Sequence, residues 1–448
     1  MSIYQDVIGQ LPILKTYSHG TLVFAIDEAA QRADVVVALQ VAIEKLIEKF
    51  PWLAGAVINK GSGPGNSGTF ELIPWPTSAS SINRVLCIRD RTDAIPSFEE
   101  LMVKKAPCSK IDGKLVTSHP GFPQSYEDSP DNPAPVLAIQ ASFIKGGLLL
   151  HFSTQHNAID ASGMMQVIQL FSVAMQGVEF SSSAIKEGNR DRSRVIPLIA
   201  SGEPIKDHSH LRRPLDLSPP KLPASTKWAY FLMDGSVVPI IKAAASQGEG
   251  YDPSVPFISS NDAMTAFYWK CIAKVRACNG RSSNAVSNLL RAIDARKAMG
   301  VSHEYMGHMV YHAATKMTLR ELDETPISAI ACKLRTDLND VNNKFSVRSY
   351  ATYIANTPDK SLVMYGGSYN PDMDIGASAV ANADFFHSFG LIGAPKFARR
   401  PNLAPIPGCV YFMPSEGQHV PVLVCLTDDD MEGLKKHPEW SKYTEFVG

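Results

Sequence analysis

The stretch His151-Phe-Ser-Thr-Gln-His156-Asn-Ala-Ile-Asp160-Ala-Ser-Gly163 places an imidazole and a carboxylate four residues apart. An apolar, strand-like run (147–152) precedes this pair, and a run with helical spacing of its apolar residues (164–174) follows it. A junction between a strand and a helix can direct a polar side chain out of a packed layer and into a cleft. We therefore predict that His156 accepts a proton from a substrate nucleophile.

The same pattern also fits a purely structural role. In that interpretation His156 is a buried histidine with a local hydrogen bond, and Asp160 caps the helix that follows, because Asp accepts free backbone N–H groups at a helix start. The chain has twelve histidines, and only His156 has an Asp at this offset. Chance alone would produce roughly one such pair in a chain of this kind, so the motif needs support from other segments.

Composition limits the classes of protein to consider. A chain of 448 residues with 45% hydrophobic and 19% charged residues is globular and long enough for two or three domains. The net charge of −1 argues against nucleic acid or an anionic membrane as a partner. The odd number of cysteines, seven, shows no metal or redox spacing and favours reduced thiols. With no signal peptide or membrane span in the pattern, we expect a cytoplasmic protein.

Strand-like and helix-like segments alternate along most of the chain. Apolar periodicity, turn residues and capping residues predict the elements. The predicted strands are 21–26, 54–58, 68–73, 137–141, 147–152, 287–293, 309–315 and 420–426. The predicted helices are 33–50, 164–174, 260–276, 327–341 and a short final one at 428–436.

A proline-rich, weakly periodic stretch (191–227) interrupts this alternation. It contains Pro197, Pro204, Pro214, Pro219, Pro220 and Pro223. Such composition is typical of a long ordered connection. We therefore predict an N-terminal domain (1–190), a crossover linker (191–227) and a C-terminal domain (228–448), part of which packs on or exchanges with the N-terminal sheet.

Several segments together resemble the BAHD-type acyl-CoA-dependent acyltransferases, most closely the fungal trichothecene 3-O-acetyltransferase-like branch. The segments are the His156-x-x-x-Asp160 motif, Pro51–Gly55, Ile258–Lys270, Asn288–Arg296, Gly393–Pro401 and Gly408–Pro414. Their order and spacing cover nearly the whole chain. This is far more specific than the His–Asp pair alone and favours the catalytic interpretation.

The resemblance implies an α/β (α+β) fold of two similar chloramphenicol-acetyltransferase-like domains, each a mixed β-sheet flanked by helices. A channel then runs along the domain interface, with His156 accessible from both ends. Acetyl-CoA or another acyl-CoA enters from one side as co-substrate, and a small-molecule alcohol enters from the other. The resemblance implies a monomer with no bound cofactor and no metal.

One segment departs from the family pattern. The family carries an Asp-Phe-Gly motif shortly before the run that here ends Arg399-Arg400-Pro401, and this chain has Ser388 in place of the aspartate. In the family that aspartate pairs with an arginine, which corresponds to Arg296. A buried guanidinium cannot deprotonate and needs another acceptor. Asp384, Asp294 and Asp160 are the candidates.

Acyl transfer to an alcohol needs a base, because a hydroxyl is a poor nucleophile at neutral pH. His156 suits this role because histidine is largely neutral at pH 7. Asp160 could orient the imidazole as in a Ser–His–Asp triad, but the resemblance favours a structural pairing of Asp160 with Arg296. Gly163 either permits a close approach of the backbone or is a plain turn glycine.

The phosphates of CoA need cationic or amide partners. Lys396, Arg399 and Arg400 are candidates, although a solvated basic loop explains them somewhat better. His303, His308 and His312 suggest zinc, but His308 and His312 fall at or within a predicted strand, where their spacing does not converge on one ion. We predict no metal site.

The leading hypothesis is an acyl-CoA-dependent O-acetyltransferase that acts on a fungal secondary metabolite. N-acylation and acyl delivery from a carrier protein are alternatives within the enzymes. A CoA-free cyclisation and a silent ligand-binding protein that uses the same channel are alternatives from other classes. Binding of CoA separates the first hypothesis from the last two.

Overall fold

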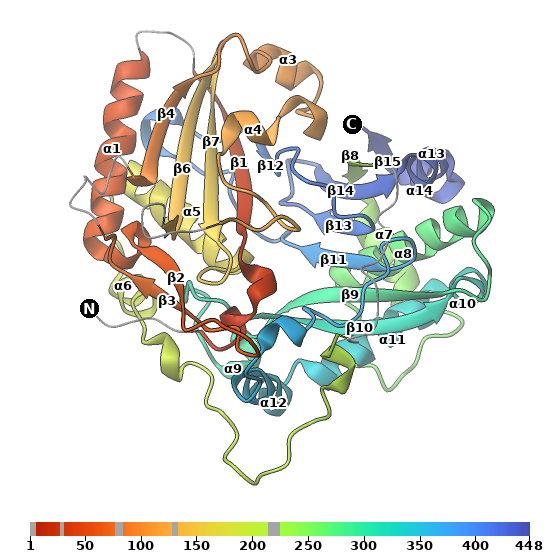
Figure 1. Ribbon diagram of the computed structural model, residues 1–448. Coiled ribbons are helices and arrows are strands. Elements are labelled where there is room, and N and C mark those ends of the chain that lie inside the picture. The colour runs from red at the N-terminus through yellow and green to blue at the C-terminus, as the bar shows by residue number, and fades with distance from the viewer. Residues whose placement is uncertain (1–5, 27–30, 77–83, 128–132, 214–224) are drawn as a thin grey trace.

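The computed structural model describes residues 6–26, 31–76, 84–127, 133–213 and 225–448. Within these ranges the strands form a five-stranded, a seven-stranded and a three-stranded sheet. Figure 1 shows the five-stranded sheet beside the seven-stranded one, with the strands of the two sheets running in different directions. The two larger sheets and their helices are the α/β architecture that the resemblance implied.

The five-stranded sheet comes mainly from the N-terminal third of the chain. Its order is β12-β1-β7-β6-β4. The strands are β1 (Tyr17–Ala25), β4 (Leu86–Asp90), β6 (Leu137–Ile144), β7 (Gly147–Gln155) and β12 (Phe397–Arg399). Successive side chains of β1 and β7 point to opposite faces of the sheet. The apolar side chains on one face pack against helices α1 (Gln31–Lys49) and α5 (Ala161–Met175).

Strand β12 comes from the C-terminal part of the chain, yet it completes the N-terminal sheet. It pairs antiparallel with β1, with Arg399 opposite Thr21 and Phe397 opposite Val23. In Figure 1 this blue strand lies beside the red β1. The two halves of the chain are therefore joined by backbone hydrogen bonds as well as by packing.

The seven-stranded sheet comes from the C-terminal half. Its order is β10-β9-β11-β13-β14-β8-β15. The strands are β8 (Thr226–Asp234), β9 (Val286–Asp294), β10 (Val310–Thr318), β11 (Ile375–Ala379), β13 (Cys409–Phe412), β14 (His419–Thr427) and β15 (Thr444–Phe446). The sheet is mixed, because β11 pairs parallel with β9 and β13 while the other neighbours are antiparallel.

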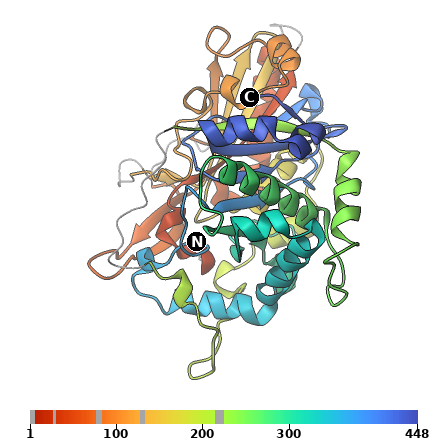
Figure 2. The same ribbon diagram turned by 90° about the vertical axis from the view of Figure 1, so that its right-hand side faces the viewer.

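Helix α8 (Ser260–Cys278) is the central helix of the C-terminal half. Ser259 caps it, and Asp262 completes a capping box because its carboxylate accepts a hydrogen bond from the Ser259 backbone N–H. The helix packs against α7 (Val237–Ala245), α10 (Leu319–Glu324) and α11 (Ile327–Val341), and Trp269 is fully buried. Figure 2 shows the green and teal helices gathered on the side of the molecule that carries the C-terminal half.

The remaining elements connect or flank these two layers. The three-stranded sheet joins β2 (Ala56–Lys60), β3 (Thr69–Ile73) and β5 (Ala134–Pro135). The other helices of the N-terminal half are α3 (Phe98–Val103), α4 (Gly113–Val116) and α6 (Ser182–Gly188). Those of the C-terminal half are α7 (Val237–Ala245), α9 (Arg296–Met299), α10 (Leu319–Glu324), α11 (Ile327–Val341), α12 (Lys344–Ala355), α13 (Asp428–Lys436) and α14 (Pro438–Tyr443).

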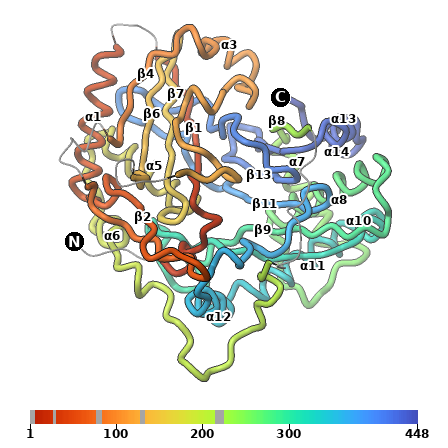
Figure 3. The backbone as a smooth tube through the Cα atoms, in the orientation of Figure 1, coloured from red at the N-terminus to blue at the C-terminus, as the bar shows by residue number. Residues whose placement is uncertain are grey.

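The proline-rich stretch forms an extended connection where the structure describes it. Figure 3 shows this yellow-green chain looping away from α6 and returning near α12. The Ile199 N–H donates to the Thr352 hydroxyl and the Lys206 N–H to the Ser349 hydroxyl, both on α12. Pro214, Pro219, Pro220 and Pro223 lie outside the described residues, so the full extent of the predicted linker stays a prediction.

The local patterns predicted most elements correctly. Helices α11 and α13 have the predicted bounds, and the predicted strands 137–141 and 147–152 lie within β6 and β7, which pair in antiparallel register. The prediction that α13 is the final helix is wrong, because α14 and β15 follow it. Within the described residues, no helix combines the length and apolar character that spanning a bilayer requires.

Candidate active site

His156 lies directly after β7, in the short loop that leads into α5. Its backbone N–H donates to the carbonyl of Thr16 at 2.9 Å, which joins the loop to the start of β1. The imidazole is half-buried, whereas its neighbours Gln155 and Asn157 are buried. The junction of strand and helix therefore leaves this side chain less buried than its neighbours, and its position in a cleft stays a prediction.

The hydrogen bond of the His156 ring defines its tautomer. Nδ1 lies 3.3 Å from the carbonyl oxygen of Ile159. A carbonyl can only accept, so Nδ1 carries the proton and Nε2 presents a lone pair. Burial lowers the pKa of His156, although the Ile159 carbonyl and the charge of Asp160 oppose this effect. The ring is therefore a neutral base near pH 7.

Asp160 is buried and its two oxygens are fully used. Oδ1 accepts from the Gly163 N–H at 2.8 Å and thereby caps α5. Arg296 donates to both oxygens at 3.0 Å, and the Met309 N–H donates to Oδ2 at 2.7 Å. Burial alone would raise the pKa of Asp160, but Arg296 and these donors lower it. The predicted structural pairing of Asp160 with Arg296 is confirmed.

Arg296 has a complete set of acceptors despite the serine at position 388. Besides Asp160, it donates to the carbonyls of Tyr305 at 3.0 Å and Gly307 at 2.7 Å, and to Asp294 at 2.9 Å. The carboxylates overcome the effect of burial and raise the pKa of Arg296.

Two of the three carboxylates proposed as partners of Arg296 are therefore confirmed, and the third is wrong. Asp384 is exposed and accepts from the backbone of Phe386. Ser388, which replaces the family aspartate, is also exposed, and its carbonyl accepts from Gln176. Asp160 and Asp294 neutralise Arg296 in a segment that does not involve residue 388.

Gly163 lies in the first turn of α5, where another backbone segment approaches it. A Cβ at this position would lie 2.3 Å from the carbonyl oxygen of Met306. No side chain fits at that distance without moving one of the two backbones. Of the two interpretations of Gly163, the close approach is confirmed.

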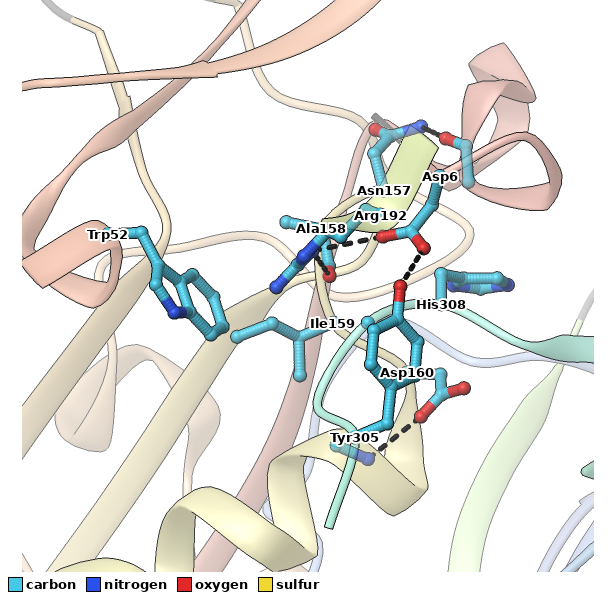
Figure 4. A network of polar contacts seen from close by, with 12 residues as sticks. Asp6, Trp52, Asn157, Ala158, Ile159, Asp160, Arg192, Tyr305 and His308 are labelled. Carbon is cyan, nitrogen blue, oxygen red and sulfur yellow. Dashed lines mark hydrogen bonds and ion pairs between the residues drawn. The ribbon is translucent and has the colours of Figure 1, made fainter. Parts of the chain in front are cut away.

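A second polar network braces the loop that carries His156 (Figure 4). Arg192 donates to Asp6 at 3.0 Å and to the carbonyl of Ala158 at 2.5 Å. The hydroxyl of Tyr305 donates to the other oxygen of Asp6. The start of the crossover, the N-terminal segment and the C-terminal half thus meet at this loop. No local sequence pattern indicates Asp6 and Arg192, because the network joins residues that are distant along the chain.

The three cationic side chains proposed for CoA lie in different environments. Arg399 is fully buried in β12, where it pairs with Glu416 and donates to the carbonyls of Ala106 and Lys105 at 3.0 Å. It has no exposed surface for a phosphate, so this prediction is wrong. Lys396 is exposed.

Arg400 is half-buried, and its guanidinium lies over the ring of Trp228, 4.4 Å from the centroid. Its Nη1 atom is buried and has no hydrogen-bond partner within the described residues. Arg400 therefore keeps an unused donor, which Arg399 does not. Neither Arg400 nor Lys396 is shown to contact CoA, and both remain candidates.

A pocket lies between the crossover, β10 and α12. It is lined by Lys206, Asp207, His208, His210, Leu211, Tyr311, His312, Val341, Ser346, Tyr350 and Gly366. A row of rings leads from this pocket to the His156 loop. Between ring centroids, His312 lies 4.2 Å from Tyr365, Tyr365 lies 6.3 Å from His308, and His308 lies 5.2 Å from His156. Within the described ranges, no three His, Cys, Asp or Glu side chains group as metal ligands.

A buried ion pair thus fixes the His156 loop and joins the two halves of the chain at this point. The chain belongs to the Transferase family, whose model matches residues 121–441. Residues 16–175 match the model of the trichothecene 3-O-acetyltransferase-like N-terminal domain. The resemblance that the sequence motifs indicated is therefore confirmed.

Similar proteins cover nearly the full chain. The O-acyltransferase pigD of Monascus ruber is 42% identical, over 99% of this chain and 98% of its own length. The O-acetyltransferase epaC of Aspergillus niger is 41% identical, over 99% and 97%. The trichothecene 3-O-acetyltransferase TRI101 of Fusarium sporotrichioides is 33% identical, over 99% and 96%.

Solved structures show the same fold. The crystal structure of F. graminearum TRI101 with coenzyme A and T-2 mycotoxin has a TM-score of 0.92 and 30% identity, and the match covers 100% of both chains. The F. sporotrichioides protein, also with coenzyme A and T-2, has a TM-score of 0.91 and 31% identity over the same coverage. Both confirm the fold class that the sequence predicted.

Proposed function

We propose that this protein transfers an acyl group, by default acetyl, from acyl-CoA to a hydroxyl of a fungal secondary metabolite, with His156 as general base. The observation that carries the proposal is the contact of His156 Nδ1 with the carbonyl oxygen of Ile159 at 3.3 Å, from which the tautomer is inferred. The Nδ1–H of His156 is directed to the Ile159 carbonyl, which leaves Nε2 unprotonated. The names of the relatives support O-acylation, and the coenzyme A in the titles of similar structures supports the donor.

The reaction follows from this arrangement. Nε2 of His156 removes the hydroxyl proton as the alcohol oxygen attacks the thioester carbonyl. The tetrahedral intermediate expels CoA thiolate, which recovers the proton from His156, so that an ester and free CoA are formed. None of the cysteines lies in a nucleophile motif, and burial raises the pKa of Cys108, Cys271 and Cys409 to about 12. These thiols are poor nucleophiles, which supports direct transfer in a ternary complex.

The pocket near the crossover is our proposed entrance for the acceptor. Its lining combines apolar and aromatic surface with imidazoles, which suits a cyclic molecule that carries hydroxyl groups. Nδ1 of His312 is buried without a hydrogen-bond partner within the described residues, and it offers such a molecule one polar contact. The row of rings from His312 to His156 gives the direction in which the acceptor would reach the base.

The proposal also covers the state of the protein in the cell. All seven cysteines are free, and most are buried, as expected in a reducing compartment. We propose a cytoplasmic monomer that needs no metal. Size-exclusion chromatography with light scattering tests the monomer, and activity after dialysis against a chelator tests the independence from metal.

The function is tested by following release of the CoA thiol from acetyl-CoA in the presence of a panel of hydroxylated and amino-bearing polycyclic compounds. The proposal predicts thiol release that depends on a hydroxylated acceptor, with the acetyl ester found by mass spectrometry. Transfer only to amines would favour N-acylation. If no acyl-CoA raises the melting temperature of the protein at millimolar concentration, a CoA-dependent reaction is contradicted.

A further inference from the structure

His308 is a fully buried histidine that contacts the main chain of His156. Its Nδ1 lies 2.9 Å from the His156 carbonyl oxygen, and its exposed fraction is 0%. Because the carbonyl only accepts, His308 carries its proton on Nδ1. Its Nε2 is buried and has no partner within the described residues. The one hydrogen bond that the ring makes in the structure is therefore directed at the catalytic residue.

The ion pair of the motif also fixes the segment that carries His308. Arg296 binds the carbonyls of Tyr305 and Gly307, and Asp160 binds the N–H of Met309. The backbone on both sides of His308 is thus fixed by the same two side chains that shape the His156 loop. Asp6 adds to this, because it accepts from the His308 backbone N–H.

The contacts of His156 show why His308 matters. The His156 N–H is bound by the carbonyl of Thr16 and the ring by the carbonyl of Ile159, so two of its three anchors are main-chain groups. The third hydrogen bond comes from the His308 side chain to the His156 carbonyl, and it is the one that a side-chain substitution can remove directly. The contact of the ring with the Ile159 carbonyl is long at 3.3 Å and therefore weak. The orientation of the His156 ring thus depends mainly on the position of the His156 backbone.

We propose that His308 is a positioning residue that holds the His156 carbonyl through its Nδ1–H and so fixes where the basic Nε2 meets the acceptor hydroxyl. The inference rests on the proposed function. A displacement of about 1 Å from reactive geometry can cost about 100-fold in rate, so a hydrogen bond behind the base affects kcat more than binding. Burial, and then the nearby His156, lower the pKa of His308 to about 3. The residue therefore stays neutral and does not oppose the charge that forms on His156 during the reaction.

Three substitutions separate this role from simple packing. Asn carries an N–H donor at the position of Nδ1, Gln carries one at the position of Nε2, and Ala carries none. We expect His308→Asn to keep kcat within about threefold of wild type, and His308→Gln and His308→Ala to lower kcat by at least about tenfold, with the KM for acetyl-CoA unchanged. Equal losses in the Asn and Ala variants, or no loss in Ala, would overturn the proposal.

The tautomer is measured independently of any variant and of activity. NMR of wild-type protein labelled with carbon-13 and nitrogen-15, with the His308 ring assigned through correlations to its own backbone, should show Nδ1 protonated and Nε2 unprotonated at pH 7. An Nε2–H tautomer would contradict the inference even if every variant misfolds. If the wild type transfers no acyl group but the Nδ1–H tautomer is present, the proposed function fails while the geometric inference stands.

Discussion

Asp160 and Arg296 form a buried, two-bond ion pair, with both Arg296 terminal nitrogens 3.0 Å from the Asp160 oxygens. The carboxylate belongs to the loop that follows β7, and the guanidinium follows β9 of the other sheet. The pair therefore ties the His156 loop of one half to the Tyr305–Met309 segment of the other. Both oxygens of the motif aspartate accept hydrogen bonds from Arg296 and from backbone N–H groups.

Asp160→Asn should reduce stability as well as rate. Removal of one partner of a buried pair costs about 3–5 kcal/mol, because the other charge is left uncompensated. Urea denaturation measures the free energy of unfolding. Asp294→Asn is the matched control, because Asp294 is 40% exposed and its ion pair with Arg296 contributes less to stability. A large loss of kcat in Asp160→Asn with unchanged stability would instead indicate a triad-like role.

Gly163→Ala should destabilise the junction between α5 and the Met306 backbone. The new Cβ would lie 2.3 Å from a carbonyl oxygen, and overpacking of this kind costs about 1–3 kcal/mol. Thermal unfolding should show a lower melting temperature than for Gln169→Ala, an exposed substitution on the same helix. Equal melting temperatures for the two variants would show that the approach of Met306 is not constrained.

The pH dependence of kcat/KM should report the ionisation of His156. The base must be neutral to act, and burial lowers its pKa from the ordinary value of 6.5. Activity should therefore be fully present at pH 7 and decline on acidification, with a midpoint below 6.5. A midpoint above 7 would mean that the imidazolium is stabilised in the free enzyme, in conflict with the buried environment.

Arg400→Gln should affect the KM for acetyl-CoA, whereas Arg399→Gln should affect stability. Arg400 keeps an unused donor, so its loss should raise the KM for acetyl-CoA by about tenfold, as expected for one charge-assisted hydrogen bond, with little change in melting temperature. Arg399 is enclosed by Glu416 and by backbone carbonyls, so its loss should lower the melting temperature. An unchanged KM for Arg400→Gln would remove this residue from the CoA site.

Local signals account for what the sequence predicted correctly. Helix α13 begins after Thr427, which caps it, and its apolar residues follow helical spacing, so both bounds could be read directly. The signals for α14 were also local, since His437 caps it and Pro438 occupies its first turn, but they were missed. The motif singled out His156, Asp160 and Gly163 as site residues because its spacing matches that of the family. Periodicity alone predicts a strand and a helix here but no site.

Contacts between distant segments explain the errors. Arg399 and Arg400 are adjacent and look equivalent in a basic loop. Arg399, however, is the last residue of β12, which pairs with β1 and is buried along its whole length, whereas Arg400 lies beyond the strand and is half-buried. His308 was considered only as a metal ligand, because its partner is a main-chain carbonyl 152 residues away. No local pattern records such a contact.

The central claim is that His156 is the base that activates the acceptor hydroxyl. The most direct test is single-turnover transfer from acetyl-CoA to an accepted alcohol by wild type and His156→Ala, with melting temperature and acetyl-CoA binding measured in parallel. We predict that transfer falls by at least about 100-fold while folding and acetyl-CoA binding are retained. Transfer by the variant at a rate near that of wild type would contradict the account.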